Sequence, residues 1–301
     1  MTVLKGVKTS MVKQRTTTFD VVFGIFNALL LTCLCVVILY PIYYMFIVSV
    51  SESNAVLRGE VTWHPIGINL DSYKVILNDR YIPRSYFNTI LYTVTGTFVN
   101  VAMTALCAYP LSRKNFQAKN VFTFMIVFTM LFDAGLIPNF LIVESLGLRN
   151  TILSIILPGA ISAYNMVIMR TFFQQLPEAL FESATIDGAG DFTIFFRILL
   201  PLSKPVLSSI TLFYAVGNWN SFLGPLLYLD DRELYPMQLI LRNIVISNEM
   251  ASMTGEMSEM LVSPVNIKYA VIFITILPIL LVYPFVQKYF NKGIMIGALK
   301  G

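Results

Sequence analysis

The sequence predicts an all-α integral membrane protein with six transmembrane helices and with both termini in the cytoplasm. Three observations support this prediction. First, 56% of the 301 residues are hydrophobic and only 13% are charged, whereas soluble chains average about 25% charged residues. Second, the chain contains apolar runs that are each long enough for a helix to cross a bilayer core. Third, Lys and Arg gather in alternate connections between these runs, the pattern that marks the cytoplasmic side.

The apolar runs are continuous rather than alternating, which favours helices over the strands of a membrane barrel. The first run is much longer than the core of a signal peptide, and no small-residue cleavage pattern follows it. We therefore expect it to remain as a membrane helix. The runs cover residues 21–50, 86–111, 121–143, 151–173, 205–229 and 266–288.

Short basic segments define the expected orientation. With six spans, the basic tails and the loop after the second run all fall on one side, and their positive charge marks that side as cytoplasmic. We therefore expect a cytoplasmic tail at 1–20, a six-helix membrane domain at 21–290 with a cytoplasmic loop at 174–204, and a cytoplasmic tail at 291–301. The basic residues are Lys5, Lys8, Lys13, Arg15, Arg113, Lys114, Lys119, Lys288, Lys292 and Lys300.

The chain lacks the residues that several functional classes require. The formal net charge is +4 and no basic cluster is interleaved with aromatic residues, so we expect no nucleic acid partner. Three cysteines within apolar runs and one histidine, His64, provide no metal-binding pattern. No Gly-Lys pair occurs in the chain, so it has no P-loop for ATP. We expect the chain to bind neither a metal nor a cofactor.

An acidic segment between the fourth and fifth runs predicts two short helices joined by a glycine turn. Pro177 suits the first position of a helix, because its missing N–H would be unpaired there anyway. Gly188 is a natural stop, since glycine adopts the left-handed conformation without steric penalty. Asp191 is expected to cap a second helix over 192–200, which Pro201 ends.

The first of these helices is expected to be amphipathic. Leu180, Phe181 and Ala184 share one face, and Glu178 and Glu182 lie one turn apart beside it. An ordinary helical loop on the cytoplasmic side would have the same features, so helix physics alone leaves that alternative open.

The spacing within this segment resembles the signature of the membrane permeases of ABC importers. That signature is Glu-Ala-Ala, then a glycine, then Ile-x-Leu-Pro after a fixed spacer. One departure is Ser183 where the family has its first alanine, and serine is small enough to allow the same close packing. The matching residues are Glu182-Ser183-Ala184, Asp187-Gly188-Ala189 and Ile198-Leu199-Leu200-Pro201.

The resemblance extends over nearly the whole chain. It is similar to carbohydrate-uptake permeases such as the smaller membrane subunit of the maltose transporter, and within them to a branch for oligosaccharides or polysaccharide fragments. It implies the type I ABC importer permease architecture. The supporting stretches are "NLDSYKVIL", "AYPLSRKNF", "SLGLRNTILSIILP", "NWNSFLGPLLYLDD" and "QKYFNKGIMIGALKG".

The resemblance also implies partners and roles. The chain would be a multi-pass, non-enzymatic subunit in a bacterial cytoplasmic membrane. It would pair with a second homologous permease, a cytoplasmic ATPase dimer that binds ATP and Mg, and an extracytoplasmic solute-binding protein that delivers an oligosaccharide. The acidic segment would be the coupling helix that docks into the ATPase. Its docking core would be Glu182, Ser183, Ala184, Asp187, Gly188 and Ala189.

Two sets of polar residues are candidates for the substrate path. Tyr214, Asn218 and Ser221 share a helical face in the fifth run and could hydrogen-bond or stack on a sugar; interhelical packing is the alternative. Asp133 is the acidic residue within the third run, and an ionisable residue inside a membrane span is by default a candidate functional residue. However, Gly135 beside it suggests a helix break near the outer surface and a structural role.

A self-sufficient secondary transporter for a small polar solute is the alternative functional class. Such proteins often show inverted repeats and carboxylates that bind coupling ions, and apart from Asp133 this chain has no such carboxylate. A membrane enzyme is not supported by any cluster of metal ligands.

Overall fold

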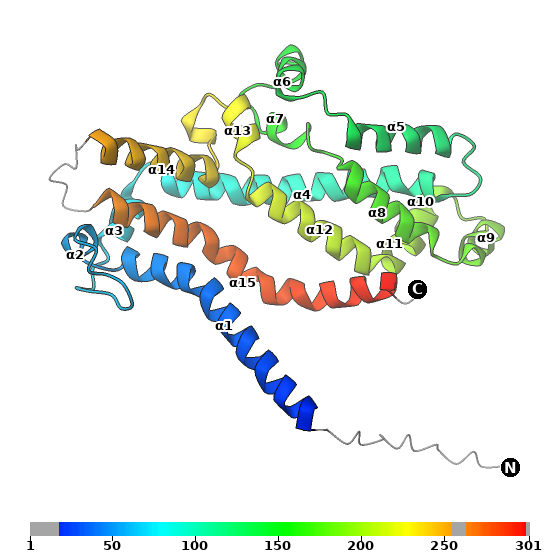
Figure 1. The fold of residues 1–301 in the computed structure, drawn as a ribbon. Helices are drawn as coiled ribbons and strands as arrows, with labels where there is room; N and C mark the ends of the chain where they lie inside the picture. The colour runs from blue at the N-terminus through cyan, green and yellow to red at the C-terminus, as the bar shows by residue number, and fades with distance from the viewer. Residues whose placement is uncertain (1–17, 255–262, 299–301) are drawn as a thin grey trace.

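The computed structural model describes residues 18–254 and 263–298, and within these ranges it contains helices and loops but no strand. The helices form an elongated bundle (Figure 1). One end, which we call the α3 end, carries the short helices α2 (Ser53–Leu57) and α3 (Asp71–Asn78). The opposite end, the α9 end, carries α9 (Glu178–Ile186), α10 (Asp191–Ile194) and α11 (Leu200–Leu202).

Three helices are long and apolar enough to cross a membrane by themselves. They are α1 (Thr18–Ser49), α4 (Ile82–Ser112) and α15 (Pro264–Ala298). They correspond to the first, second and sixth predicted runs, which the structure therefore confirms as helices. α15 continues to Ala298, beyond the predicted domain limit at residue 290.

Each of the other three predicted runs is divided into two helices. Hydropathy averages over a run and does not register the residues that interrupt it, such as Gly135 with a φ of +87° or the Pro158–Gly159 pair. The helices are α5 (Lys119–Leu131) and α6 (Leu136–Ser145), α7 (Ile152–Ile156) and α8 (Ala163–Gln174), and α12 (Lys204–Trp219) and α13 (Leu223–Tyr228).

Two pairs of helices are sharply bent and count as further candidate spans. α5 and α6 are bent by 118°, and the helical segment 191–202 is bent by 83° relative to α12. The described residues therefore hold three candidate spans, or up to five if each bent pair is one span. The total of six stays a prediction, and so does the assignment of both termini to the cytoplasm. Residues 1–17 and 299–301, which include the basic Lys5, Lys8, Lys13, Arg15 and Lys300, lie outside the described residues.

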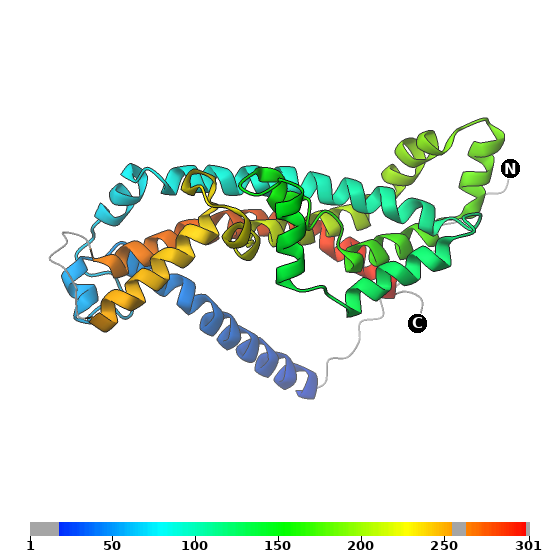
Figure 2. The same cartoon turned by 90° about the horizontal axis from the view of Figure 1, so that it is seen from above.

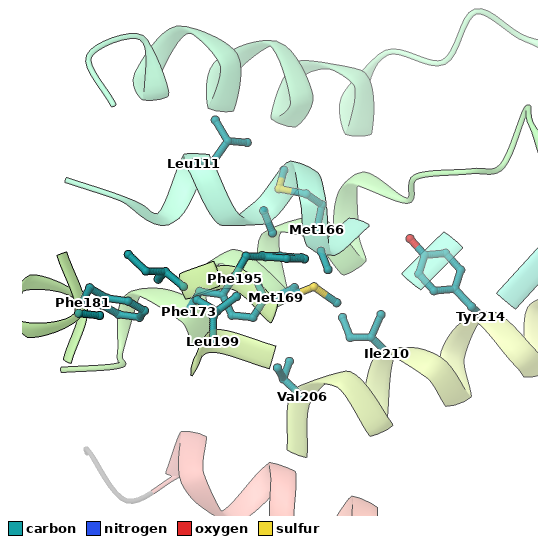
Figure 3. Packing of buried hydrophobic residues seen from close by; sticks show 14 residues of the cluster. Leu111, Met166, Met169, Phe173, Phe181, Phe195, Leu199, Val206, Ile210 and Tyr214 are labelled. Atoms are coloured by element: carbon teal, nitrogen blue, oxygen red, sulfur yellow. The ribbon is translucent and has the colours of Figure 1, made fainter. Parts of the chain in front are cut away.

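The bundle is organised around α4. α8 and α12 pack along it, and α15 packs against α12, α1 and α14 (Met237–Thr254). The largest cluster of buried hydrophobic side chains lies toward the α9 end, and Figure 3 shows Phe181 of α9 beside Phe173 of α8 and Leu199. Two of the short helices at the α9 end therefore contribute side chains to this cluster: Phe181 and Ala184 of α9 and Ile194 of α10.

α1 leaves the bundle over most of its length (Figures 1 and 2). Residues 18–39 of this helix are exposed, whereas Ile47 and Val48 near its end are each 1% exposed. Its exposed side chains are predominantly apolar, as expected of a surface that faces lipid or another membrane helix.

Candidate coupling site

The first helix of the acidic segment ends as the sequence predicts. Gly188 has a φ of +81°, and its N–H donates to the carbonyl of Thr185 at 3.0 Å, while the N–H of Ala189 donates to the carbonyl of Ala184 at 2.9 Å. These two bonds define a Schellman motif, in which a left-handed glycine closes the helix. Pro177 lies at the N-cap, one residue before the predicted position.

The second helix differs from the prediction at both ends. Asp191 is its first residue rather than its cap, which is Gly190, and the helix continues through Pro201 to Leu202. A proline inside a regular α-helix clashes with the carbonyl four residues earlier. Here a π-helical turn, η1 (Phe195–Leu199), directly precedes the proline region and relaxes the regular spacing. The chain then turns at Ser203, which is the N-cap of α12.

The apolar face of α9 packs against its own chain. Phe181 is 2% and Ala184 is 7% exposed, and both belong to the largest core cluster. Leu180, which was expected on the same face, is 41% exposed at the rim. The predicted apolar face is therefore mostly occupied, and a partner would contact the opposite face of the helix.

That opposite face contains most of the expected docking residues. Glu182, Ser183, Asp187 and Gly188 are exposed, whereas Ala189 is half-buried. Sequence reasoning missed Ile186, whose side chain is 86% exposed at the end of α9. The sequence did contain a signal for this residue. An isoleucine directly before the Asp187-Gly188 turn lies outside the apolar face of Leu180, Phe181 and Ala184, so its side chain is expected to be exposed.

The candidate path residues of the fifth run contact other helices. Tyr214 on α12 is 7% exposed. Its hydroxyl lies 2.7 Å from the Thr104 hydroxyl on α4 and accepts the N–H of Ser162 at 2.8 Å. These contacts favour the packing alternative, and a role in sugar binding stays a prediction.

Asn218 and Ser221 lie on either side of the end of α12. The Asn218 amide donates to Oδ1 of Asn100 on α4. Ser221 lies after Trp219, where α12 ends, and is half-buried in the connection to α13. The expected polar stripe is therefore interrupted by a helix break.

Asp133 lies in the sharp bend between α5 and α6 and is exposed. Its Oδ1 accepts the N–H of Gly135 at 3.0 Å, so the carboxylate stabilises the turn in which it lies. This geometry favours the structural alternative that the neighbouring glycine suggested.

In the described ranges the chain is an all-helical bundle with candidate membrane spans and a glycine-turned pair of short helices at one end, the arrangement expected of a membrane permease subunit. The chain belongs to the family described as binding-protein-dependent transport system inner membrane component, which matches residues 87–296. This match confirms the resemblance found in the sequence.

Relatives support the same assignment. The chain is 42% identical over 277 residues to the polygalacturonan/rhamnogalacturonan transport system permease protein YtcP of Bacillus subtilis (strain 168). The match covers 91% of this chain and 95% of the relative. It is 41% identical over 281 residues to protein LplC of the same organism, covering 93% and 95% of the two chains.

A solved structure shows the same fold. A chain of a bacterial ABC transporter involved in the import of the acidic polysaccharide alginate matches with a TM-score of 0.84 and 36% sequence identity. The match covers 92% of this chain and 100% of that one. The chain is therefore a permease subunit of an ABC importer with the type I permease fold, a transport subunit of the bacterial inner membrane.

Proposed function

We propose that this chain imports oligosaccharides and that residues 177–201 couple closure of an ATPase dimer to alternating access of the transport path. The observation that carries this proposal is the position of α9. It lies at one end of the bundle with one face exposed, while its other face shares a core cluster with α4, α8 and α12. A displacement of α9 is therefore passed to three helices of the bundle, because closely packed cores transmit strain.

The surface of this chain that would contact the ATPase consists of the exposed residues of α9 and of the turn that follows it. Glu182 and Asp187 offer carboxylates, and Ile186 offers an apolar side chain that is 86% exposed among the described residues. A short helix with such an apolar anchor suits a groove on a partner. Ala184 and Ala189 support this surface from behind, where small side chains allow close packing. ATP and Mg would be bound by the ATPase.

The α9 end would lie in the cytoplasm, with both termini on that side. The C-terminal end of α15 lies at the α9 end of the bundle (Figure 1). Arg113, Lys114 and Lys119 follow α4 at this end as well. The cytoplasmic side of membrane proteins is enriched in such residues.

An oligosaccharide is the substrate class that the relatives support. One relative is named for polygalacturonan/rhamnogalacturonan transport, and the matching solved structure is described as importing the acidic polysaccharide alginate. The partners would be a second homologous permease, the ATPase dimer and a solute-binding protein outside the membrane.

Purification of the tagged chain from its own membrane tests this function. An ATPase and a second permease should co-purify, and uptake of labelled oligogalacturonides into vesicles should require ATP inside and the binding protein outside. If no ATPase co-purifies, and uptake persists without ATP but stops when ion gradients are collapsed, the chain is a secondary transporter instead.

A further inference from the structure

Arg113 connects the end of α4 to the beginning of α9. It follows the last residue of α4, and its Nη2 lies 3.2 Å from Oε1 of Glu178, the first residue of α9. The same guanidinium lies over the ring of Phe181, with its Cζ 4.2 Å from the ring centroid. The side chains of Arg113 and Glu178 are 21% and 29% exposed. One side chain therefore makes two different contacts with α9 in a partly desolvated position.

Arginine is suited to this double contact. Its planar guanidinium stacks on an aromatic face while the N–H groups at its edge bind a carboxylate. Lysine carries its charge on a single ammonium group and cannot reproduce both contacts at once. The arrangement therefore fixes the orientation of α9 relative to α4, and a charge alone would not do so.

Other contacts make the end of α4 a rigid support. The Nε of Arg170 on α8 donates to the Leu111 carbonyl at 2.9 Å, so a second arginine satisfies an otherwise free carbonyl at the end of α4. Leu111 and Ala108 of α4 are buried in the same core cluster as Phe181. Arg113 thus links α9 to a helix end that is already held by packing.

We propose that Arg113 is a positioning residue for transport: it clamps α9 to α4, so that movement of α9 passes directly to α4. This proposal rests on the proposed coupling function. Apolar packing in the shared core cluster already joins α9 to α4, and Arg113 adds a directional polar contact between the two helices. α4 also provides Asn100, which donates to the Gly159 carbonyl between α7 and α8, and Thr104, whose hydroxyl bonds to that of Tyr214 on α12. Arg113 would therefore connect the ATPase contact to the centre of the bundle.

The test uses the complete importer in proteoliposomes. Three quantities are measured: the amount of ATPase that co-purifies, the rate of ATP hydrolysis, and the number of oligogalacturonides transported per ATP. For Arg113→Ala, we expect normal ATPase content and a transport-to-hydrolysis ratio lowered about fivefold, the change in a conformational equilibrium that loss of about 1 kcal/mol of interaction produces. Glu178→Gln removes the same pair from the other side with little change in shape, and should lower the ratio in the same direction.

Arg80→Ala is the control for loss of an arginine–glutamate pair at the other end of α4, although the Arg80 side chain is more exposed, at 76%. Arg80 precedes α4 as Arg113 follows it, pairs with Glu233 at 2.7 Å and lies 5.7 Å from the Tyr81 ring, but at the α3 end. Its replacement should leave the ratio unchanged. Arg113→Glu combined with Glu178→Arg should restore part of the ratio that Arg113→Glu loses, which shows that the pair itself, and not either side chain alone, is responsible.

The outcomes separate this proposal from the function on which it rests. An unchanged ratio in Arg113→Ala and Glu178→Gln would overturn the clamp. Loss of the ATPase from the Arg113→Ala complex would also overturn it, because the arginine would then be needed for assembly rather than for transmission. If the wild-type chain carries no ATPase and shows no ATP-dependent uptake, the proposed function itself fails.

Discussion

The side-chain amide of Asn218 on α12 donates a hydrogen bond to Oδ1 of Asn100 on α4, with a nitrogen–oxygen distance of 3.0 Å. The amide of Asn100 in turn donates to the carbonyl of Gly159 at 2.6 Å. Gly159 lies in the break between α7 and α8, where backbone groups have no helical partner. These two asparagines therefore join three segments that are remote in sequence and satisfy a carbonyl that an apolar environment would leave unpaired.

Gly96 allows this contact, so we predict that Gly96→Ala destabilises the protein. A Cβ at this position would lie 2.9 Å from the Asn218 Nδ2 and 3.3 Å from its Cγ. Asn218 would have to rotate away and release Asn100. Interhelical hydrogen bonds in membranes contribute on average about 0.6 kcal/mol. Lost packing adds to this loss and the helix propensity of alanine offsets part of it, so we expect a net destabilisation of up to about 1 kcal/mol. The melting temperature of the purified complex measures the change.

Gly217→Ala is the control for that substitution. Gly217 is also a helical glycine, on α12 beside Asn218, but a Cβ there would have no atom within 4 Å. It should leave the melting temperature unchanged or raise it slightly, since alanine favours helix. Equal losses in the two variants would show that the contact with Asn218 is not the cause.

Tyr214→Phe is predicted to lower stability without changing apparent affinity for the oligosaccharide. The hydroxyl contacts Thr104 and the Ser162 N–H, and its removal leaves a buried donor unsatisfied at a cost of about 1–3 kcal/mol. Thermal unfolding and the KM for uptake are measured on the same preparation. A raised KM with unchanged stability would instead assign Tyr214 to the sugar path.

Local signals in the sequence predicted the candidate site better than contacts between distant residues. The glycine turn at Gly188 depends on the backbone preference of one residue, and it was predictable. The roles of Asn100 and Arg113 depend on helices brought together by folding, and no local pattern marks them. The continuation of the helix through Pro201 was missed because it depends on a π-helical turn just before the proline.

For the fold as well, some features were predictable from the sequence pattern and others were not. The first, second and sixth apolar runs are single helices although each contains proline: Pro41 lies within α1, Pro110 within α4, and Pro278 and Pro284 within α15. The fourth run reads as apolar throughout, yet Pro158–Gly159 separates α7 from α8. Hydropathy therefore located the apolar segments, whereas the breaks that build the centre of the bundle required attention to individual residues.

Gly188→Ala is predicted to uncouple transport. The φ of +81° costs an alanine about 1–2 kcal/mol, so the turn after α9 would shift and the docking surface with it. ATPase content or the transport-to-hydrolysis ratio should fall. Gly190→Ala is the control two residues away: its φ is −76° and a Cβ would have no atom within 4 Å. If both variants transport normally, the turn has no coupling role.

Ile186→Ser is predicted to weaken ATPase binding without loss of stability. The isoleucine side chain is 86% exposed, so its removal takes nothing from the core. Full burial of such a side chain in a partner groove would contribute about 1.5–3 kcal/mol. The amount of ATPase retained during purification measures the effect. Leu77→Ser, at a leucine 72% exposed at the α3 end, is the control and should retain the ATPase.

Asn150 is predicted to stabilise the connection before α7 in two separable ways. Its φ is +57°, and its Oδ1 accepts the N–H groups of Asp230 and Asp231 at 3.1 and 3.0 Å. Asn150→Gly loses the acceptor but adopts this φ freely, whereas Asn150→Ala loses the acceptor and adds about 1–2 kcal/mol of strain. The melting temperature should therefore fall for glycine and fall further for alanine. Equal values would show that backbone strain is absent, and a glycine variant as stable as wild type would show that the two hydrogen bonds contribute nothing.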